Sequence, residues 1–406
     1  MAQKLMPKYE IVNQNDVADI YIINTCSVTN MSDRKSRQMI RRAKEKNKDA
    51  FIIVVGCYAE VAKDEIEKID EVDLVLGNHQ KANIDKYIEA FFDGKNLEDN
   101  VIENYFYDFG SITYTEKVRA VIKVQDGCNN FCTYCIIPYA RGRICSRKPE
   151  SVIEEITKIA DEGIKEVVIT GIQVSAYGKD FDNDYRLIDL LEEINKIDGI
   201  ERIRLGSIEP LMITDEFCDR VSKLDKMCHH FHLSLQSGCD KTLKEMNRKY
   251  TTKQFRDVVR RLRNLYDDVI LTTDIIVGFP NESDEDFETT YKFLDEIKFY
   301  KMHVFKYSQR KGTVAEKMKN QVPAEIKDKR SKRLIQLSDK NESEYLKEYI
   351  GKVVKVLIEE KDGDYIKGHT ENYIMVKTKS VKDLANEFVD VAVNNVEKDC
   401  LIGDMK

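Results

Sequence analysis

The sequence predicts an α/β protein with three parts: an N-terminal parallel α/β sheet domain, a central partial β/α barrel and a small C-terminal all-β barrel. Three observations predict this organisation. The 406 residues are too many for one ordinary domain. Short β-rich runs alternate with charged helical stretches through most of the chain, and the last part changes to closely spaced short strands. We expect the three domains to cover residues 1–95, 117–340 and 343–406.

The first part contains three predicted strands, each followed by a predicted helix. The strands are Ile20–Asn24, Phe51–Val55 and Val72–Leu76, and the helices are Ser32–Lys48, Ala59–Ile69 and Ala82–Phe92. This βαβ rhythm is typical of a parallel sheet, in which the groups that follow neighbouring strands meet at one edge. A polar stretch, Gly94–Asn104, is a predicted linker.

The central part repeats the rhythm on a larger scale. Its strands are predicted at Val118–Val124, Glu166–Thr170, Arg202–Leu205, His230–Leu235, Val269–Ile276 and Tyr300–Phe305. Six such units predict a full or partial β/α barrel, in which the chemistry lies at the carboxyl ends of the strands. A long charged helix, Pro323–Tyr349, leads to the last part, whose strands are predicted at Val353–Glu359, Tyr365–Thr370, Tyr373–Thr378 and Phe388–Asn394.

The composition restricts the class of protein. Hydrophobic residues make up 42% and charged residues 34% of the chain, which is typical of a globular protein with ample core. No run approaches the roughly 18 apolar residues of a membrane span, and the N-terminus lacks the apolar stretch of a signal peptide. We therefore expect a cytoplasmic protein with no membrane partner. In such a chain the ten cysteines indicate metal binding or catalysis rather than disulfides.

A cysteine-rich loop follows the strand predicted at Val118–Val124. Cys128, Cys132 and Cys135 form a CxxxCxxC pattern in this loop. Cysteine thiolates are the usual ligands of iron–sulfur clusters, and this spacing lets one loop hold three corners of a [4Fe-4S] cube. The fourth iron stays open for the amino and carboxylate groups of S-adenosylmethionine (SAM). A zinc site is the alternative, but it usually needs a fourth close ligand, which the loop lacks.

These cysteines match the signature of the radical SAM superfamily. Together with residues 138–142 and the pair Ser146 and Arg147, they make the chain resemble the methylthiotransferase branch of that superfamily. The resemblance covers nearly the whole chain and continues through residues 170–173, 205–210, 233–238, 246–248, 274–280 and 307–313. The last part resembles a TRAM module. The resemblance implies a transferase that transfers sulfur and a methyl group.

Polar residues fall at or just past the predicted barrel strands, where they line the barrel mouth. Gly171 would let SAM approach the backbone closely, Arg248 could meet its carboxylate, and Glu209 or Asp274 could bind its ribose hydroxyls. As a set, Gly171, Gln173, Ser207, Glu209, Ser234, Gln236, Arg248 and Asp274 favour SAM binding. The alternative for each is a structural hydrogen bond at the barrel rim.

Cys26 and Cys57 follow the first two predicted strands. At adjacent strand ends they could share a metal cluster, or they are two buried free thiols. The resemblance favours the cluster, because methylthiotransferases carry an auxiliary [4Fe-4S] cluster on three N-terminal cysteines. Cys26 and Cys57 match the second and third, while the first strand and its cysteine, the third ligand, are missing from this chain. An internal start site, a true truncation and a substitute ligand such as Cys145 are the three explanations.

Residues 29–38 resemble the branch of the family that acts on tRNA carrying N6-threonylcarbamoyladenosine at position 37. The implied product is the 2-methylthio derivative, and the implied partners are the tRNA anticodon stem-loop and an electron donor protein. We expect a monomer. A basic stripe in the same region is either an RNA contact or a solvated helix face, and its members are Arg34, Arg37, Arg41, Lys44 and Lys48.

Two other functions stay open at this point. One is a methylthiotransferase that acts on another tRNA base or on a ribosomal protein. The other is an RNA-binding variant with a defective auxiliary cluster. A second basic cluster, Arg256, Arg260, Arg261 and Arg263, has the same two interpretations as the first. In the last part, Tyr373 either stacks on a base or belongs to the core.

Overall fold

The computed structural model describes residues 1–13, 15–27, 30–95, 106 and 118–406. These residues form two compact units. The first comprises the described residues of segments 1–112, 126–145 and 308–317, and the second those of segments 113–125, 146–307 and 318–406. The predicted linker lies outside the described residues from position 96 onward. Within the described part, no helix is both long and apolar enough to cross a membrane. The three domain boundaries stay a prediction.

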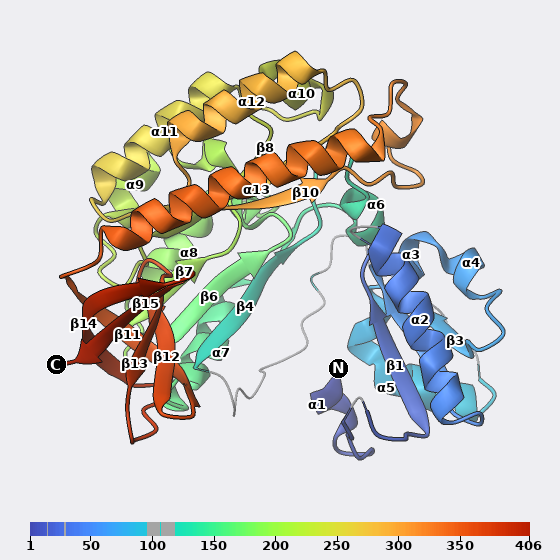
Figure 1. Ribbon diagram of the computed structural model, residues 1–406. Coiled ribbons are helices and arrows are strands. Elements are labelled where there is room, and N and C mark those ends of the chain that lie inside the picture. The colour runs from blue at the N-terminus through green and yellow to red at the C-terminus, as the bar shows by residue number, and fades with distance from the viewer. Residues whose placement is uncertain (14, 28–29, 96–105, 107–117) are drawn as a thin grey trace. The chain divides into compact units, whose positions relative to one another are not determined.

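The first unit is built around the predicted parallel sheet, with strand order β1-β2-β3. The strands are β1 (Ile20–Thr25), β2 (Phe51–Gly56) and β3 (Leu74–Leu76). Helices cover both faces, so β2 is buried along its whole length (Figure 1). On one face, α2 (Asn30–Lys46) packs Ile40 against the sheet, and on the other α5 (Ile84–Phe92) packs Ile88 against it.

Short helices complete the first unit. They are α1 (Ala2–Leu5), α3 (Cys57–Val61), α4 (Lys63–Ile66), η1 (Gln80–Asn83), α6 (Ile137–Arg141) and η4 (Ala315–Lys317). The single helix predicted over Ala59–Ile69 is wrong. Ala62 leaves the helical conformation, with φ −133° and ψ 34°, and this break separates α3 from α4.

The second unit contains six parallel strands that form a partial barrel. They are β4 (Arg119–Asp126), β6 (Glu166–Gly171), β7 (Arg202–Leu205), β8 (His230–Gln236), β9 (Ile270–Val277) and β10 (Lys301–Lys306). They form one sheet ordered β5-β4-β6-β7, in which β5 is Cys145–Ser146, and one ordered β10-β9-β8. The parallel bridges Ile203 to Met227 and Ile208 to Leu233 connect β7 to β8 across the gap. The predicted partial barrel is therefore confirmed.

Amphipathic helices separate the barrel strands and cover their outer side (Figure 1). They are α7 (Pro149–Asp161), α8 (Leu187–Ile194), α9 (Asp215–Val221), α10 (Asp240–Glu245), α11 (Thr252–Leu265), α12 (Asp284–Ile297) and α13 (Ala324–Lys347), with η2 (Val174–Ala176) and η3 (Pro210–Met212). Along β8, Leu233 and Leu235 are buried in the core, while Ser234 and Gln236 alternate with them and are half-buried. Polar residues of the strands therefore face away from the core that the helices cover.

The last part of the chain is a closed five-stranded barrel with strand order β11-β12-β13-β15-β14. The strands are β11 (Val353–Asp362), β12 (Tyr365–Thr370), β13 (Met375–Lys379), β14 (Phe388–Glu397) and β15 (Cys400–Met405). The all-β prediction is confirmed, although it missed β15. The strand predicted from Tyr373 begins at Met375, because Tyr373 has a left-handed backbone with φ +70°.

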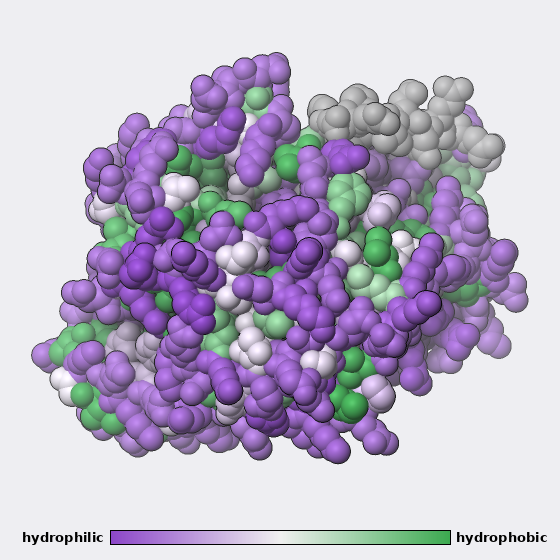
Figure 2. Space-filling view, turned by 90° about the horizontal axis from the view of Figure 1, so that it is seen from above, coloured by the Kyte–Doolittle hydropathy of each residue, from purple (hydrophilic) through white to green (hydrophobic). Residues whose placement is uncertain are grey.

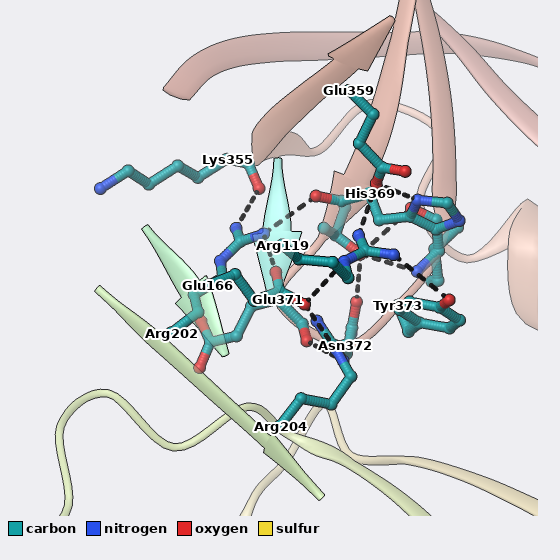
Figure 3. A network of polar contacts seen from close by, with 12 residues as sticks. Arg119, Glu166, Arg202, Arg204, Lys355, Glu359, His369, Glu371, Asn372 and Tyr373 are labelled. Atoms are coloured by element: carbon teal, nitrogen blue, oxygen red, sulfur yellow. Dashed lines mark hydrogen bonds and ion pairs between the residues drawn. The ribbon is translucent and has the colours of Figure 1, made fainter. Parts of the chain in front are cut away.

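A buried ion-pair network joins this barrel to the amino ends of β4, β6 and β7 (Figure 3). Glu166, which is fully buried, accepts from Arg204 at 2.9 Å and pairs with Arg119 at 3.1 Å. Arg119 also pairs with Glu359 of β11 at 2.5 Å. Arg202 donates to the backbone carbonyls of Lys355 and His369, both at 3.0 Å. Guanidinium groups of the central barrel thus satisfy polar groups of the C-terminal barrel directly.

Tyr373 belongs to this network. Its ring stacks on His369 with centroids 4.5 Å apart, and the guanidinium of Arg204 lies 4.6 Å from its centroid. Its hydroxyl accepts from Arg119 at 3.3 Å. These contacts use the ring for packing between the two barrels, which favours the structural interpretation of Tyr373 over a base-stacking one.

The face of the molecule in Figure 2 is mostly hydrophilic. Hydrophobic residues occur on it as small separate groups rather than as one large patch. This agrees with the high content of charged residues, 34% of the chain.

Candidate active site

The CxxxCxxC loop begins one residue after β4 ends, and backbone hydrogen bonds hold it. The N–H of Cys128 donates to the carbonyl of Gly142 at 3.1 Å, and the N–H of Ala315 donates to the carbonyl of Thr133 at 2.8 Å. Inside the loop, the N–H of Cys135 donates to the carbonyl of Cys132 at 2.9 Å. Anchors on two separate segments therefore fix the shape of the loop.

The start of this loop requires glycine. Gly127 has φ +68°, and a Cβ at this position would lie 1.8 Å from the carbonyl oxygen of Arg143. Only a residue without a side chain allows the loop to approach the segment that anchors it. Phe131, inside the loop, also has a positive φ of 48°, and the guanidinium of Arg143 lies 4.7 Å from its ring centroid. The strained residue is thus held by a specific contact.

The thiols of Cys128, Cys132 and Cys135 fit an iron–sulfur cluster better than a zinc ion. All three are half-buried, and the N–H of Asn130 lies 3.5 Å from the sulfur of Cys128. Among the described residues, these thiols do not form a group whose donor atoms all lie within 4.8 Å of one another, as one ion would require. Three cysteine thiols on one loop match three ligands of a [4Fe-4S] cluster.

Cys26 and Cys57 lie at adjacent strand ends, as predicted. They directly follow β1 and β2, whose last residues Thr25 and Gly56 are partners in the parallel register. A Cβ on Gly56 would lie 2.3 Å from the carbonyl oxygen of Thr25, so the two strand ends approach closely because this residue is glycine. Cys26 is exposed and Cys57 is buried. The pair fits two corners of a cluster.

The predicted substitute for the third ligand of this cluster lies in β5. Cys145 is buried there. Its role as a ligand stays a prediction.

Two side chains that were not predicted as site residues contact Cys57. The Nε of Arg141 donates to its sulfur at 3.0 Å, and the Nδ2 of Asn78 lies 3.7 Å from the same atom. Arg141 ends α6, shortly after the CxxxCxxC loop, and it also pairs with Asp126 at 3.3 Å. Spacing in the sequence gave no signal for this contact, because 84 positions separate Cys57 from Arg141.

The charge of Arg141 is well supported. Burial by itself lowers the pKa of its guanidinium, but Asp126 and the Cys57 sulfur more than offset this, and the net direction is upward. Arg141 therefore places a permanent cation beside the sulfur of Cys57. Hydrogen bonds from cationic groups to ligand sulfurs are one means by which a protein tunes an iron–sulfur cluster.

The segment 308–317 also contacts the residues around Cys26 in the first unit. Arg310 pairs with Asp33 at the start of α2 at 2.8 Å, and it donates to the hydroxyl of Ser27 as well. Ser27 directly follows Cys26 in the sequence. The conformation of the chain around Cys26 therefore depends on a residue almost three hundred positions away, with a separation of 283.

The second unit brings three of the predicted SAM ligands together. Arg248 donates to the carboxylate of Glu209 at 2.8 Å and to the backbone carbonyl of Ser234 at 2.9 Å. The N–H of Glu209 donates to the hydroxyl of Ser175 at 2.7 Å. These residues follow β7 or lie in and after β8. They form a polar group at the carboxyl ends of the strands, where a barrel binds its ligand.

Gly171 and Gln173 lie around a buried glutamine. The side-chain oxygen of Gln125 accepts from the N–H of Gln173 at 2.7 Å, and a Cβ on Gly171 would lie 2.9 Å from the side chain of Gln125. Ser207 is exposed just after β7, and Gln236 ends β8 with φ +71°. Contact of these residues with SAM stays a prediction.

Asp274 differs from the other predicted SAM ligands. It lies on β9, and one of its carboxylate oxygens is 3.4 Å from the Nε2 of His232 on β8. Ligand atoms of Asp274, His232 and His303 all lie within 4.8 Å of one another. Asp274 therefore belongs to a separate polar group within the barrel.

Other cysteines lack the properties of ligands. Burial raises the pKa of the Cys228 thiol to about 12 and that of Cys400 to about 11. Burial also raises the pKa of Cys218. Neutral thiols of this kind act as small apolar side chains.

Comparison with known proteins identifies the family of this chain. Residues 122–294 match the model of the radical SAM superfamily, and residues 1–77 match the model described as uncharacterized protein family UPF0004. The threonylcarbamoyladenosine tRNA methylthiotransferase MtaB of Bacillus subtilis is 41% identical over 395 residues, which cover 95% of this chain and 87% of that protein. The chain belongs to the radical SAM methylthiotransferase family. Its cofactors are therefore SAM, a [4Fe-4S] cluster and the auxiliary [4Fe-4S] cluster of this family.

Further relatives support the assignment of this chain to the methylthiotransferase family. MtaB of Aquifex aeolicus is 41% identical, with coverage of 93% of this chain and 91% of that protein. The tRNA-2-methylthio-N(6)-dimethylallyladenosine synthase of Clostridium botulinum is 35% identical, with coverage of 98% and 90%. Among solved structures, the radical SAM methyltransferase TsrM of Kitasatospora setae has a TM-score of 0.57 at 15% identity, covering 74% of this chain and 66% of that one. That likeness shows the fold alone.

Proposed function

We propose that this chain converts N6-threonylcarbamoyladenosine at position 37 of tRNA into its 2-methylthio derivative. The observation that carries the proposal is the first compact unit, which holds both the CxxxCxxC loop and the strand ends with Cys26 and Cys57. The two MtaB relatives, each 41% identical over almost the whole chain, are named for this activity. The dimethylallyladenosine relative is less similar, at 35% identity.

Each group of residues has a distinct task in this reaction. Cys128, Cys132 and Cys135 hold the cluster that, when bound, supplies the one-electron chemistry needed to break the unactivated C2–H bond of an adenine. Cys26 and Cys57 hold the auxiliary cluster from two adjacent strand ends. The other residues of the site orient these groups.

The charged residues of the barrel mouth orient SAM. Arg248 and Glu209, which already pair with each other, offer a cation for its carboxylate and an anion for its hydroxyls or amino group. Ser207 and Gln236, at the ends of β7 and β8, line the same edge. Arg141 acts on the other cofactor, because it holds a positive charge on the sulfur of Cys57.

The basic residues of α2, together with Lys48 just after it, are candidates for phosphate contacts. Arg34, Arg41 and Lys48 are exposed, whereas Arg37 donates to the hydroxyl of Tyr58 at 2.7 Å and Lys44 to the carbonyl of Ala50 at 2.8 Å. The exposed members of the stripe would bind the backbone of the anticodon stem-loop without regard to its sequence. The remaining partners in this proposal are an electron donor protein and cytoplasmic tRNA, and the enzyme acts as a monomer.

The second basic cluster does not contribute in this way. Arg256 pairs with Glu296 at 2.6 Å and Arg260 with Asp257 at 2.8 Å. The charges of these arginines are therefore compensated within the protein, which favours the solvated-face interpretation for this cluster.

The decisive experiment supplies the cluster-loaded enzyme with SAM, a reductant and three substrates in parallel. The substrates are tRNA carrying N6-threonylcarbamoyladenosine, tRNA carrying N6-dimethylallyladenosine and ribosomal protein. We expect the methylthio group, detected by mass spectrometry of digested nucleosides, only in the first reaction. A product only on dimethylallyladenosine or on protein would replace the proposed substrate. The Cys132→Ala variant is the matched control, because it should lose about four irons and all product.

The second candidate is an RNA-binding protein whose auxiliary cluster, with Cys26 and Cys57 among its ligands, is defective. This candidate predicts about four irons per chain after anaerobic reconstitution rather than about eight. It also predicts SAM cleavage without any methylthio product on any of the three substrates. Iron analysis and product analysis on one preparation therefore separate the two functions.

A further inference from the structure

Two histidines and an aspartate form a compact group on three neighbouring strands of the second unit. His232 lies on β8, Asp274 on β9 and His303 on β10, and the register pairs His303 with Asp274 directly. One ligand atom from each residue lies within 4.8 Å of the others, and the described part of the chain contains no other such group of three. We propose that this group binds a single divalent transition-metal ion such as Zn²⁺.

The orientation of His232 supports this proposal. Its Nδ1 lies 3.0 Å from the hydroxyl oxygen of Thr272, and that oxygen is 3.2 Å from the Nε2 of His230. The hydroxyl of Thr272 can donate to the Nε2 of His230, which is a ring nitrogen of a buried residue. The oxygen of Thr272 then accepts from the Nδ1–H of His232. Such a second partner fixes the tautomer of metal-binding histidines and leaves Nε2 as the ligand atom.

The Nε2 of His232 is the atom that this arrangement leaves for a metal. It is buried, without a hydrogen-bond partner in the described structure, and 3.4 Å from a carboxylate oxygen of Asp274. A nitrogen lone pair that faces a carboxylate is repelled by it. A cation bound by both atoms removes this repulsion and satisfies the buried nitrogen.

The donor set and its spacing suit a small divalent ion. Two imidazoles and one carboxylate are the ligands of many zinc and non-haem iron sites, and they leave a position open for water or another ligand. With bonds of about 2.0–2.1 Å, a tetrahedral zinc ion sets its donors roughly 3.3 Å apart. The atoms of His232 and Asp274 are already 3.4 Å apart, and a ring nitrogen of His303 lies within 4.8 Å of the ligand atoms of both residues.

His303 provides access to the site. It is exposed, which gives an ion a path from solvent. The charge of the neighbouring Lys301 is paired with Glu342.

In this arrangement Asp274 binds the ion rather than the ribose of SAM. The main rival is a metal-free ion pair in which His232 carries a proton on Nε2 and donates it to Asp274. The rival predicts no specific metal uptake, so metal binding separates the two directly.

The test measures zinc and iron per chain in the cluster-loaded enzyme. The protein is stripped of loosely bound metal with a chelator, equilibrated with buffered free zinc and analysed by elemental mass spectrometry. We expect about one zinc per chain at saturation with unchanged iron content. His303→Gln and Asp274→Asn should weaken zinc binding by at least about 100-fold. His79→Gln, a histidine substitution in the first unit, is the matched control and should bind zinc like the unaltered protein.

Three outcomes would overturn the proposal. The first is no zinc uptake by the unaltered enzyme, and the second is unchanged affinity in His303→Gln. The third is zinc uptake matched by loss of iron, which would show that zinc replaces iron at the cysteines. The zinc absorption edge gives an independent readout, because the proposed site requires nitrogen and oxygen neighbours and no sulfur. Cluster absorbance and the unfolding midpoint confirm that each variant is folded.

Discussion

At the scale of single residues, the contact between Arg141 and Cys57 links the two cysteine-bearing regions of the first unit. A guanidinium N–H donates to the sulfur of a predicted cluster ligand at 3.0 Å. Hydrogen bonds to cluster sulfurs are one of the means by which proteins set reduction potentials. Arg141 therefore acts through Cys57, as a positioning residue, rather than on the substrate.

Arg141→Lys tests this role because it keeps the charge and removes the Nε–H. We expect methylthio product to fall by about tenfold or more, while SAM cleavage at the CxxxCxxC loop stays nearly unchanged. The electron paramagnetic resonance signal or the potential of the auxiliary cluster should shift, which a purely structural role would not cause. Arg42→Lys, at an exposed position of α2, is the matched control. Equal loss of SAM cleavage and product would contradict the assignment.

At the scale of elements, two glycines with positive φ differ in their surroundings. One has open space where a Cβ would lie, and the other lies against a backbone carbonyl. Gly127 precedes the CxxxCxxC loop with φ +68°, and Gly163 follows α7 with φ +85°. An added Cβ at Gly127 would collide with the carbonyl oxygen of Arg143 at 1.8 Å, while one at Gly163 would meet no atom within 4 Å. Alanine substitution at Gly163 therefore tests the backbone strain alone, whereas substitution at Gly127 tests the strain together with a steric clash.

Gly163→Ala should destabilise the protein by about 1 kcal/mol and leave iron content unchanged. Gly127→Ala should move the start of the loop and lose about four irons per chain, together with SAM cleavage. Iron analysis after reconstitution and urea unfolding measure the two effects. Full iron loading and SAM cleavage in Gly127→Ala would show that the loop tolerates displacement and that the close approach is incidental.

At the scale of the whole second unit, one buried carboxylate serves three arginines of the network in Figure 3. Glu166 lies within 4 Å of Arg119, Arg202 and Arg204, and the same arginines bind the C-terminal barrel. Buried ion pairs of this kind contribute little net stability compared with apolar packing, but they are costly to break on one side only. The network therefore fixes how the two barrels pack.

Glu166→Gln keeps the shape of the side chain and removes the charge that the arginines share. We expect a loss of about 3–5 kcal/mol in the free energy of unfolding, measured by anaerobic urea titration. Glu162→Gln, an exposed neighbour in the sequence, should change it by less than about 0.5 kcal/mol. If both variants lose the same small amount, the network does not hold the barrels together.

The carboxylates of Glu166 and Glu359 in this network make the stability of the protein depend on pH. Burial by itself raises the pKa of Glu166 and Glu359, but the arginines around Glu166 and His369 beside Glu359 more than offset it, and both pKa values lie below the usual value for glutamate. Their contribution is fully present above the unfolded-state pKa of about 4.3 and is lost as pH falls through the lower folded-state values.

Urea titrations should therefore show that the free energy of unfolding of the unaltered protein decreases as the pH is lowered from about 7 to about 3.5. In Glu166→Gln this fall should be shallower, because one group with a depressed pKa is absent. A parallel pH dependence in the two proteins would show that other carboxylates dominate.

How far the sequence predicts the fold depends on how local each signal is. The period of two in β8 and the alternation of strands with helices placed the sheet and the barrels correctly, because burial of alternate side chains is a local property. The sequence did not predict the helix break at Ala62, because alanine favours a helix and is not a typical residue at a helix end. The strand β15 was also missed, since its place in the barrel depends on pairing with two distant strands.

The candidate site likewise contains residues that local sequence patterns predicted and residues that only the tertiary structure brought together. The sequence by itself determined the CxxxCxxC loop and the adjacent ends at Cys26 and Cys57, because ligand spacing and strand order are written along the chain. Only the tertiary structure placed Arg141 on Cys57, Arg310 beside Ser27, and His303 with His232 and Asp274. These pairs are separated by up to 283 positions. Such contacts arise from packing of whole elements, which spacing within one segment does not encode.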